Sequence, residues 1–283
     1  MDRRKLEEKI GKVLMTAAAL VIMATLLLIL GTVVVKGLPA LDLDMITRIP
    51  EGGFYLGKEG GVLNAIVGSL YLAGGATVLA FIISLPVVLY FNVYGRRGSR
   101  LAVFARVCFD VLWGIPSIVY GAFGFTIMIF FGLRASLLGG IIAVALLVFP
   151  IMSRAMDEVL RIMPEELLEA SYALGATRWE TACKVVARQA LPGLATAVLI
   201  AFGRGIGDAA SVIFTAGFTD HLPSSLLRPA ATLPLAIFYQ LGTPFPEVRE
   251  RAYASALILT AIILIISVLV RLLTRKMSRN IIK

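Results

Sequence analysis

Long apolar segments alternate with short charged segments along the whole chain. A membrane-spanning helix needs about 20 mostly apolar residues, because each residue advances roughly 1.5 Å through a hydrocarbon core about 30 Å thick. Six segments meet this requirement: 13–35, 63–94, 111–133, 135–153, 191–218 and 252–270. The pattern therefore predicts an all-α polytopic membrane protein with six transmembrane helices.

The composition excludes the other broad classes of protein. Apolar residues make up 59% of the chain and charged residues only 16%, whereas a soluble domain carries about 25% charged residues. A soluble enzyme, a disordered chain and a disulfide scaffold do not fit these values. The net charge is +9, and the charged residues lie between the apolar segments. We therefore expect the chain to interact with the membrane and not with nucleic acid. With two cysteines and one histidine, we expect no metal and no other cofactor.

The basic residues predict the orientation. If the N-terminus is cytoplasmic, nineteen Lys and Arg residues fall on the cytoplasmic side and seven on the other. Lys and Arg concentrate on the cytoplasmic side of membrane proteins, so we expect both termini there. The predicted regions are a cytoplasmic segment with the first helix (1–36), an extracytoplasmic loop (37–62), a core of five helices (63–276) and a cytoplasmic tail (277–283).

The predicted cytoplasmic connection at 154–191 is longer than two neighbouring spans require. Pro164 followed by two glutamates is typical of a helix start, because acidic side chains interact favourably with the positive end of the helix dipole. Gly175 is a typical C-cap, and Thr177 opens the T-x-x-E capping-box pattern of a second helix. We expect that helix to end near Pro192. The segment thus predicts a rigid helical hairpin that presents a defined shape to a partner.

Two charged residues lie inside the fifth predicted span. Arg204 follows Pro192 by 12 residues, about 18 Å along a helix, and Asp208 is four residues further on the same face. A charge near the membrane centre costs about 2.5–3.5 kcal/mol, so it is expected to be paired or to line a pathway. Either the pair is an internal salt bridge that only packs two subunits, or Arg204 attracts a passing anion while Asp208 restrains it.

Glycine occupies every second position around this pair, at Gly203, Gly205 and Gly207. Each one destabilises a helix interior by about 1 kcal/mol. Gly203 and Gly207 also form a G-x-x-x-G pattern, which lets another helix approach closely. We expect these glycines to loosen the fifth helix or to pack against a neighbour. A nucleotide-binding loop is excluded, because no strand precedes the glycines and no Walker A pattern occurs in the chain.

The hairpin resembles the EAA loop of ABC-importer permeases, a family with the type I, MetI-like fold. The resemblance rests on Glu169, Ala170 and Ser171, followed after three residues by Gly175. It implies a coupling element that docks on a cytoplasmic ATPase dimer, with these four residues at its core. The chain departs from the family pattern further on, because the expected Leu-Pro pair comes four residues late, at 191–192.

Further segments resemble permease subunits of phosphate importers. Residues 114–124 (GIPSIVYGAFG) and 203–218 (GRGIGDAASVIFTAGF) are similar to their third and fifth spans, while 232–235 and 252–257 resemble the PstA-type subunit. The resemblance covers roughly 62–276. It implies half of a heterodimeric pore that imports inorganic phosphate across a bacterial or archaeal inner membrane. A second permease, the ATPase dimer and an extracytoplasmic phosphate-binding protein would complete the transporter, and ATP hydrolysis would not reside on this chain.

Other functions stay open from the sequence. A permease for sulfate, molybdate or tungstate would have the same fold, since selectivity would come largely from the binding protein. An ion-coupled secondary transporter or channel would also suit an intramembrane Arg–Asp pair, but the long hairpin and the lack of matched broken repeats count against it. A membrane scaffold would leave Arg204 and Asp208 with only a packing role.

Overall fold

The structure is a computed structural model that describes residues 3–51, 59–95 and 99–277. The helices are α1 (Arg3–Gly37), α2 (Leu43–Thr47), α3 (Leu63–Leu89), α4 (Arg100–Trp113), α5 (Ser117–Phe130), α6 (Leu137–Arg161), α7 (Glu165–Ala173), α8 (Arg178–Glu180), α9 (Ala187–Ile206), α10 (Leu233–Leu241) and α11 (Pro246–Met277). A 3-10 turn covers Leu38–Ala40, π-helical turns cover Tyr90–Tyr94 and Thr181–Val186, and an antiparallel pair of strands consists of β1 (Pro50–Glu51) and β2 (Glu59–Gly60). The predicted tail 277–283, apart from Met277, lies outside the described residues, as do residues 52–58 of the predicted outer loop.

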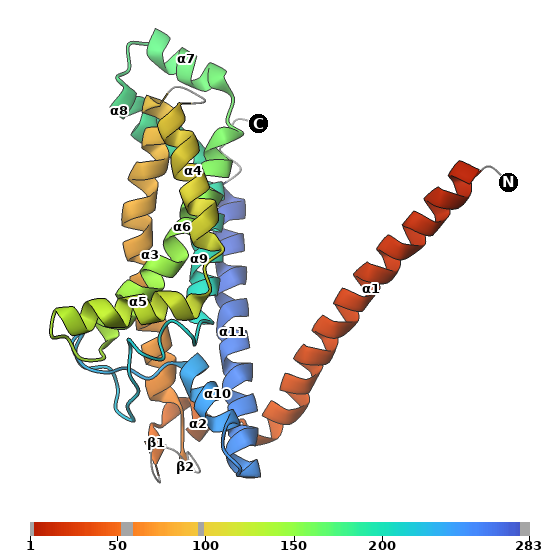
Figure 1. Cartoon of the computed structure of the whole chain (residues 1–283), viewed down its shortest axis with the longest axis vertical. Helices are drawn as coiled ribbons and strands as arrows, with labels where there is room; N and C mark the ends of the chain where they lie inside the picture. The colour runs from red at the N-terminus through yellow and green to blue at the C-terminus, as the bar shows by residue number, and fades with distance from the viewer. Residues whose placement is uncertain (1–2, 52–58, 96–98, 278–283) are drawn as a thin grey trace.

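Five of the described helical segments are long and apolar enough to cross a membrane. They are Glu7–Ala40, Leu63–Tyr94, Leu137–Arg161, Arg178–Ile206 and Pro246–Arg275. A sixth span results when α4 and α5 are counted together. In Figure 1 the helices other than α1 form one elongated bundle, with α7 at one end and the two strands at the other. The all-α, multi-span fold predicted from the apolar segments is therefore confirmed.

The third predicted span, 111–133, is not a continuous helix. α4 and α5 are bent by 99° at a short break between them. Pro116 lies in this break with an extended backbone, φ −58° and ψ 139°, and a proline nitrogen has no hydrogen to donate to a helix. The hydroxyl of Tyr120 donates to the Leu112 carbonyl across the break, at 2.8 Å. As a result α5 lies across the bundle instead of along it (Figure 1).

The fifth predicted span, 191–218, also differs from the structure at both ends. Arg178–Ile206 forms one helical segment that passes through Pro192, so the second hairpin helix does not end there. Transmembrane helices tolerate a proline where neighbouring elements pack around it, and the buried Ala190 and Leu194 flank this one. After Ile206 the chain continues as turns and irregular backbone up to the start of α10.

α3, α6 and α9 pack together as the centre of the bundle. Small side chains, among them Ala73, Ala76 and Ala80, are fully buried along α3. Such residues let helix backbones approach closely in a membrane, where no hydrophobic effect drives helices together. Ser153 of α6 donates a hydrogen bond to Ser84 of α3 at 2.9 Å, which ties the two helices at one level.

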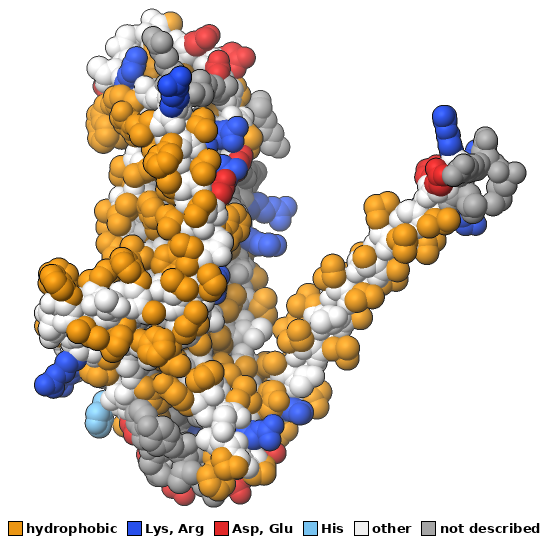
Figure 2. All heavy atoms as spheres, viewed as in Figure 1, with side chains coloured by type: hydrophobic (Ala, Val, Ile, Leu, Met, Phe, Trp, Pro, Cys, Tyr) orange, Lys and Arg blue, Asp and Glu red, His pale blue; other side chains and the backbone are white. Residues whose placement is uncertain are grey.

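α1 packs against α11 near its C-terminal end, where Lys36 lies over the ring of Tyr253. A Cβ on Gly37 would lie only 2.7 Å from the Tyr253 carbonyl oxygen, so glycine allows α1 and α11 to touch there. From that point α1 extends away from the other helices (Figure 1), and its large apolar side chains are exposed. Figure 2 shows apolar side chains along its length. This helix therefore needs lipid or another protein to cover it.

Candidate functional site

Arg204 and Asp208 form an ion pair at the point where α9 ends. The Arg204 Nη1 lies 2.8 Å from Asp208 Oδ1, and the Asp208 side chain is 3% exposed against 42% for Arg204. The other carboxylate oxygen of Asp208 accepts from the Ser211 backbone N–H at 2.8 Å and from the Ser211 hydroxyl at 2.5 Å. Both carboxylate oxygens of Asp208 are therefore engaged, whereas the Arg204 side chain stays partly exposed.

The position of this pair differs from the one expected on an unbroken helix. Gly207 caps α9, and Asp208 opens the irregular segment that follows. By accepting from Ser211, Asp208 holds the first turn of that segment as an N-cap side chain does. The carboxylate thus performs two local tasks, since it both orients Arg204 and fixes the chain after the helix.

The irregular segment after Asp208 lies in a cradle formed by glycines of α5 and α6. A Cβ on Gly121 would come within 2.8 Å of the Ser211 carbonyl oxygen, and one on Gly140 within 2.8 Å of the Ala216 side chain. Only glycine leaves room for such backbone contacts. The two sequence stretches 114–124 and 203–218 therefore meet in space, which their separation along the chain does not predict.

The three glycines around the pair have different surroundings. A Cβ on Gly205 would lie 3.1 Å from Val144 of α6, so this glycine packs α9 against α6. Gly203 has nothing within 4 Å, and Gly207 only the carbonyl oxygen of Gly203. The expected close approach of another helix therefore occurs within this chain at Gly205 alone. Gly203, Arg204 and Gly207, together with the half-exposed Ile200, form what we call the open face of α9.

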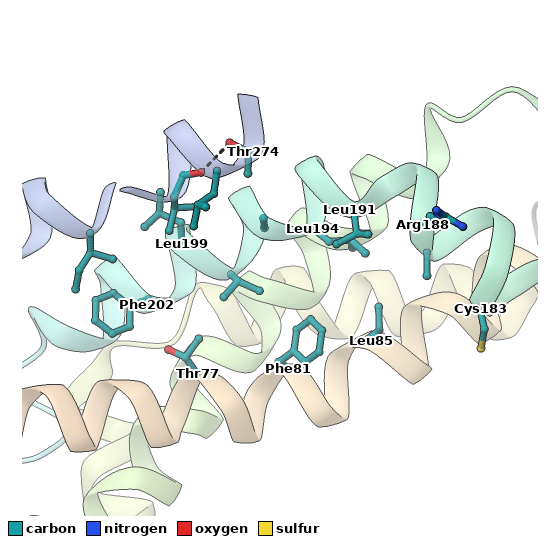
Figure 3. A pocket seen from close by; sticks show the side chains of 16 residues that line it. Thr77, Phe81, Leu85, Cys183, Arg188, Leu191, Leu194, Leu199, Phe202 and Thr274 are labelled. Carbon is teal, nitrogen blue, oxygen red and sulfur yellow. Dashed lines mark hydrogen bonds between the residues drawn. The ribbon is translucent and has the colours of Figure 1, made fainter. Parts of the chain in front are cut away.

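A large groove nearby has the wrong chemistry for an anion. It measures about 840 Å³ and lies between α3, α9 and α11 (Figure 3). Apolar side chains such as Phe81, Leu194 and Phe202 dominate its lining, and Arg204 is absent from it. A phosphate-like ion would lose its hydration there with few donors to compensate. The groove suits an acyl chain or an apolar helix, so Arg204 remains the candidate contact for an anion.

The cytoplasmic hairpin follows the local signals of its sequence. α7 begins directly after Pro164, which is its N-cap and not its first helical residue, with Glu165 and Glu166 in the first turn. Gly175 has φ +82°, the left-handed conformation of a helix C-cap glycine. Thr177 and Glu180 form the expected capping box, with both reciprocal hydrogen bonds.

The four residues of the EAA resemblance divide between the surface and the interior. Glu169, Ala170 and Gly175 are exposed. Ser171 is 7% exposed, and its hydroxyl hydrogen-bonds with that of the fully buried Thr181 at 2.9 Å. Ser171 therefore joins α7 to the start of the helical segment Arg178–Ile206 and ties the two parts of the hairpin to each other.

Sequence reasoning missed the apolar side chains at the tip of this hairpin. Leu174 is 90% exposed, Trp179 66% and Ile162 80%, although none of them lies in a predicted span. Large exposed apolar residues at one end of a molecule mark a surface for another protein. The available signal was the presence of Leu and Trp next to a glycine turn, outside any apolar run.

The chain matches known transport proteins. Residues 89–279 match the family described as "Binding-protein-dependent transport system inner membrane component". The phosphate transport system permease protein PstA of Haemophilus influenzae is 34% identical over 244 residues, which cover 86% of this chain and 85% of that protein. PstA of Yersinia pestis is 34% identical over 273 residues, with 96% and 92% covered. The inward-facing MetNI methionine ABC transporter matches with a TM-score of 0.63 at 22% identity, over 76% of this chain and 95% of that one.

The matched region contains the broken third span, the hairpin and the Arg204–Asp208 pair. The similarity to the MetNI transporter extends the agreement from sequence to fold. This chain is therefore a multi-pass member of the family of binding-protein-dependent transport system inner membrane components, the permease subunits of ABC importers with the MetI-like fold.

Proposed function

We propose that this chain is the PstA-type permease subunit of an ABC importer that moves inorganic phosphate inward. The similarity to two proteins named as phosphate transport permeases supports the substrate. The observation that carries the proposal is the Arg204 guanidinium, which is 42% exposed on the open face of α9 although it lies within an apolar span. A charge in that position is expected to face a pathway or a protein partner and not lipid.

The geometry of the pair suits passage of an anion better than tight binding. The accessible N–H groups of Arg204 are oriented donors for phosphate oxygens. Asp208 stays ionically bound to the same guanidinium at 2.8 Å, which lowers its attraction for a second anion. A transport site must bind strongly enough for entry and weakly enough for release. We therefore assign Arg204 as a transient phosphate contact and Asp208 as its restraint, with Gly203 and Gly207 leaving space beside them.

The open face of α9 is incomplete in a single chain. A second permease subunit placed against it would form the other wall of the pathway, in a heterodimer. The uncovered apolar surface of α1 supplies further area for that subunit or for membrane lipid. Both termini lie in the cytoplasm in this arrangement, and an extracytoplasmic phosphate-binding protein delivers the ion to the opposite end.

The hairpin is the proposed contact with the ATPase dimer, which hydrolyses ATP on separate chains. Glu169, Ala170 and Gly175 lie on its surface, and the buried Ser171 stabilises it through its hydrogen bond with Thr181. The exposed Leu174 and its apolar neighbours at the tip are suited to a groove on the ATPase. The segment 154–191 thus acts as the coupling region.

Uptake of radiolabelled phosphate by cells carrying the complete transporter tests this function. Replacing Arg204 by Gln is expected to lower ATP-dependent uptake about tenfold or more, because a hydrogen bond to a charged group contributes about 1.5–3 kcal/mol. Arg271→Gln is the matched control. It removes an exposed positive charge from α11, outside the hairpin and outside the open face of α9, and is expected to leave uptake unchanged.

Competing ions and energy depletion separate the alternatives in the same assay. Uptake that excess sulfate or molybdate suppresses would assign another oxyanion to this permease. Uptake that survives ATP depletion at constant membrane potential would indicate a secondary transporter. Equal uptake by the wild type and Arg204→Gln would reduce the pair to a packing role.

A further inference from the structure

A buried carboxylate at the hairpin end of the bundle holds three elements together. Asp157 of α6 is 1% exposed. Its carboxylate accepts two hydrogen bonds from Arg106 of α4, one from Nε at 2.7 Å and one from Nη2 at 3.0 Å. It also accepts from Asn92, in the π-helical turn after α3, at 2.8 Å. Asp157 thus connects α3, α4 and α6 at one point.

A second ion pair with reversed charges lies beside the first. Arg154 of α6 places Nε 3.2 Å from Asp110 of α4, and its Nη2 lies 3.0 Å from Glu158 on its own helix. Its Nη1 is 3.8 Å from Asp157. Each of the two helices therefore supplies one positively and one negatively charged side chain to the two ion pairs. We call Arg106, Asp110, Arg154 and Asp157 the α4–α6 clamp.

The attachment of α4 to the bundle depends strongly on this clamp. Only Ala102 and Phe109 are buried among the side chains of α4. Phe109 meets Phe149 of α6 edge to face, with 5.6 Å between the ring centroids. Two ion pairs with the charges reversed between the helices can both form in only one register of α4 along α6. The clamp therefore sets the position of α4 along α6.

α4 and α6 connect the two functional regions described above. α6 ends at Arg161, shortly before α7 begins the hairpin. α4 leads through the 99° break into α5, where Gly121 touches the backbone of Ser211. Ser211 in turn donates two hydrogen bonds to Asp208. Figure 1 shows α4 beside α6 below α7, and α5 crossing the bundle where α4 ends. Packed helices with discrete polar contacts are the means by which proteins couple distant sites.

We propose that Asp157 is a positioning residue for transport, which acts through the α4–α6 clamp to transmit movement of the hairpin to the segment that holds Arg204 and Asp208. This inference rests on the proposed function, because it assigns the hairpin as the input and the ion pair as the output. Without the clamp, the hairpin would still dock and ATP would still be hydrolysed, but α4 and α5 would follow its movement poorly.

The test requires a variant that removes the buried Arg106–Asp157 pair of the clamp without leaving a buried charge. Replacing Asp157 by Asn and Arg106 by Gln together substitutes two neutral amide side chains for the ion pair. Asp110→Asn removes only the outer ion pair, and its side chain is 52% exposed, so folding is not at risk. Ser153→Ala is the matched control, because it deletes a buried hydrogen bond between α3 and α6 and does not touch α4.

The measurement is phosphate imported per ATP hydrolysed by the complete transporter in proteoliposomes. The double variant is expected to keep its ATPase rate and to lower this ratio about tenfold, within the 5–150-fold range typical of coupling between sites. Asp110→Asn should give a smaller decrease and Ser153→Ala none. An unchanged ratio in Asp110→Asn or in the double variant overturns the proposal. So does a fall in ATPase rate and uptake in the same proportion. If the double variant does not assemble, Asp110→Asn decides.

A second readout does not depend on the identity of the substrate. A single cysteine replaces Ile200 on the open face of α9 in a chain whose Cys108 and Cys183 are serine, and its rate of maleimide labelling is measured with and without ATP. ATP is expected to change labelling in the otherwise wild-type chain and not in the double variant. This result would support the clamp even if phosphate itself were not transported. ATP-dependent labelling that persists in the double variant would contradict it.

Discussion

Among the Arg–Asp ion pairs of this chain, Arg204–Asp208 and Arg106–Asp157 have the same chemistry and different surroundings. In Arg204–Asp208 both residues belong to one short stretch of chain, 2.8 Å apart, and the Arg side chain is 42% exposed. In Arg106–Asp157 the residues come from two helices, 2.7 Å apart, and the Arg side chain is 18% exposed. The first pair leaves the Arg side chain exposed, as the proposed contact with a passing ion requires. The second uses them to hold helices together.

The difference shows that the residue types of an ion pair do not by themselves reveal its role. A pair within one segment cannot fix the distance between two helices, because both partners move together. A pair between helices does so, and its burial makes the loss of either partner strongly destabilising. The predictions below test whether this division into a contact for the ion and a contact for the helices is correct.

The largest effect is expected for Asp157→Ala. Removing one partner of a buried ion pair leaves Arg106 uncompensated and destabilises the fold by about 3–5 kcal/mol. The midpoint of thermal unfolding of the detergent-solubilised chain measures this loss. Asp110→Ala is the control, since its 52% exposed side chain should contribute no more than about 1 kcal/mol. Equal shifts in the two variants would remove the distinction between buried and exposed parts of the clamp.

An intermediate effect is expected where the two regions meet. In Gly121→Leu, the new side chain must displace the Ser211 backbone, because even a Cβ would lie 2.8 Å from its carbonyl oxygen. Forcing extra atoms into a packed site costs about 1–3 kcal/mol. Phosphate uptake should fall strongly while the ATPase still co-purifies.

Gly74→Ala provides the comparison for that variant, because a Cβ at Gly74 has nothing within 4 Å. It is expected to transport normally and to gain slightly in helix stability. Normal uptake by Gly121→Leu would show that the contact between α5 and the irregular segment is dispensable.

The smallest effect on the fold is expected at the hairpin, in Gly175→Asp. The φ of +82° costs a residue with a side chain about 1–2 kcal/mol, although nothing lies within 4 Å of the new Cβ. The turn should distort and the ATPase should no longer co-purify. Gly175→Asn should retain more ATPase, because Asn adopts this conformation more readily. Full retention by the Asp variant would place the coupling surface elsewhere.

The helix starts and the glycine turn of the hairpin were predictable from the sequence, whereas the end of its second helix was not. Helix starts, capping boxes and C-cap glycines are signals that operate over three or four residues, and Pro164, Gly175 and Thr177 each act within that range. The third and fifth spans were not predictable in this way. Hydropathy depends only on composition. A run of apolar residues therefore has the same hydropathy whether it forms one straight helix, a bent pair of helices or a helix followed by packed turns.

The charged residues show the same limit. The i,i+4 spacing was enough to predict that Arg204 and Asp208 lie close together, although Asp208 follows the end of α9 instead of lying on its face. Arg106 and Asp157 are 51 residues apart, and nothing in their spacing indicates a contact. Only the packing of α4 on α6 brings them together. The burial that separates the roles of the two pairs likewise comes from the whole bundle.

The amino-acid sequence was sufficient to predict a membrane-embedded bundle, the position of the hairpin turn and the proximity of Arg204 to Asp208. The tertiary structure decided that α5 crosses the bundle, that α9 ends at Ile206 and that a buried carboxylate joins three elements. The two kinds of feature differ in whether the interacting residues are close in the sequence or only in space. Hydropathy, capping and helix periodicity depend on neighbours along the chain, whereas burial, backbone contact at glycine and ion pairs between helices depend on neighbours in space.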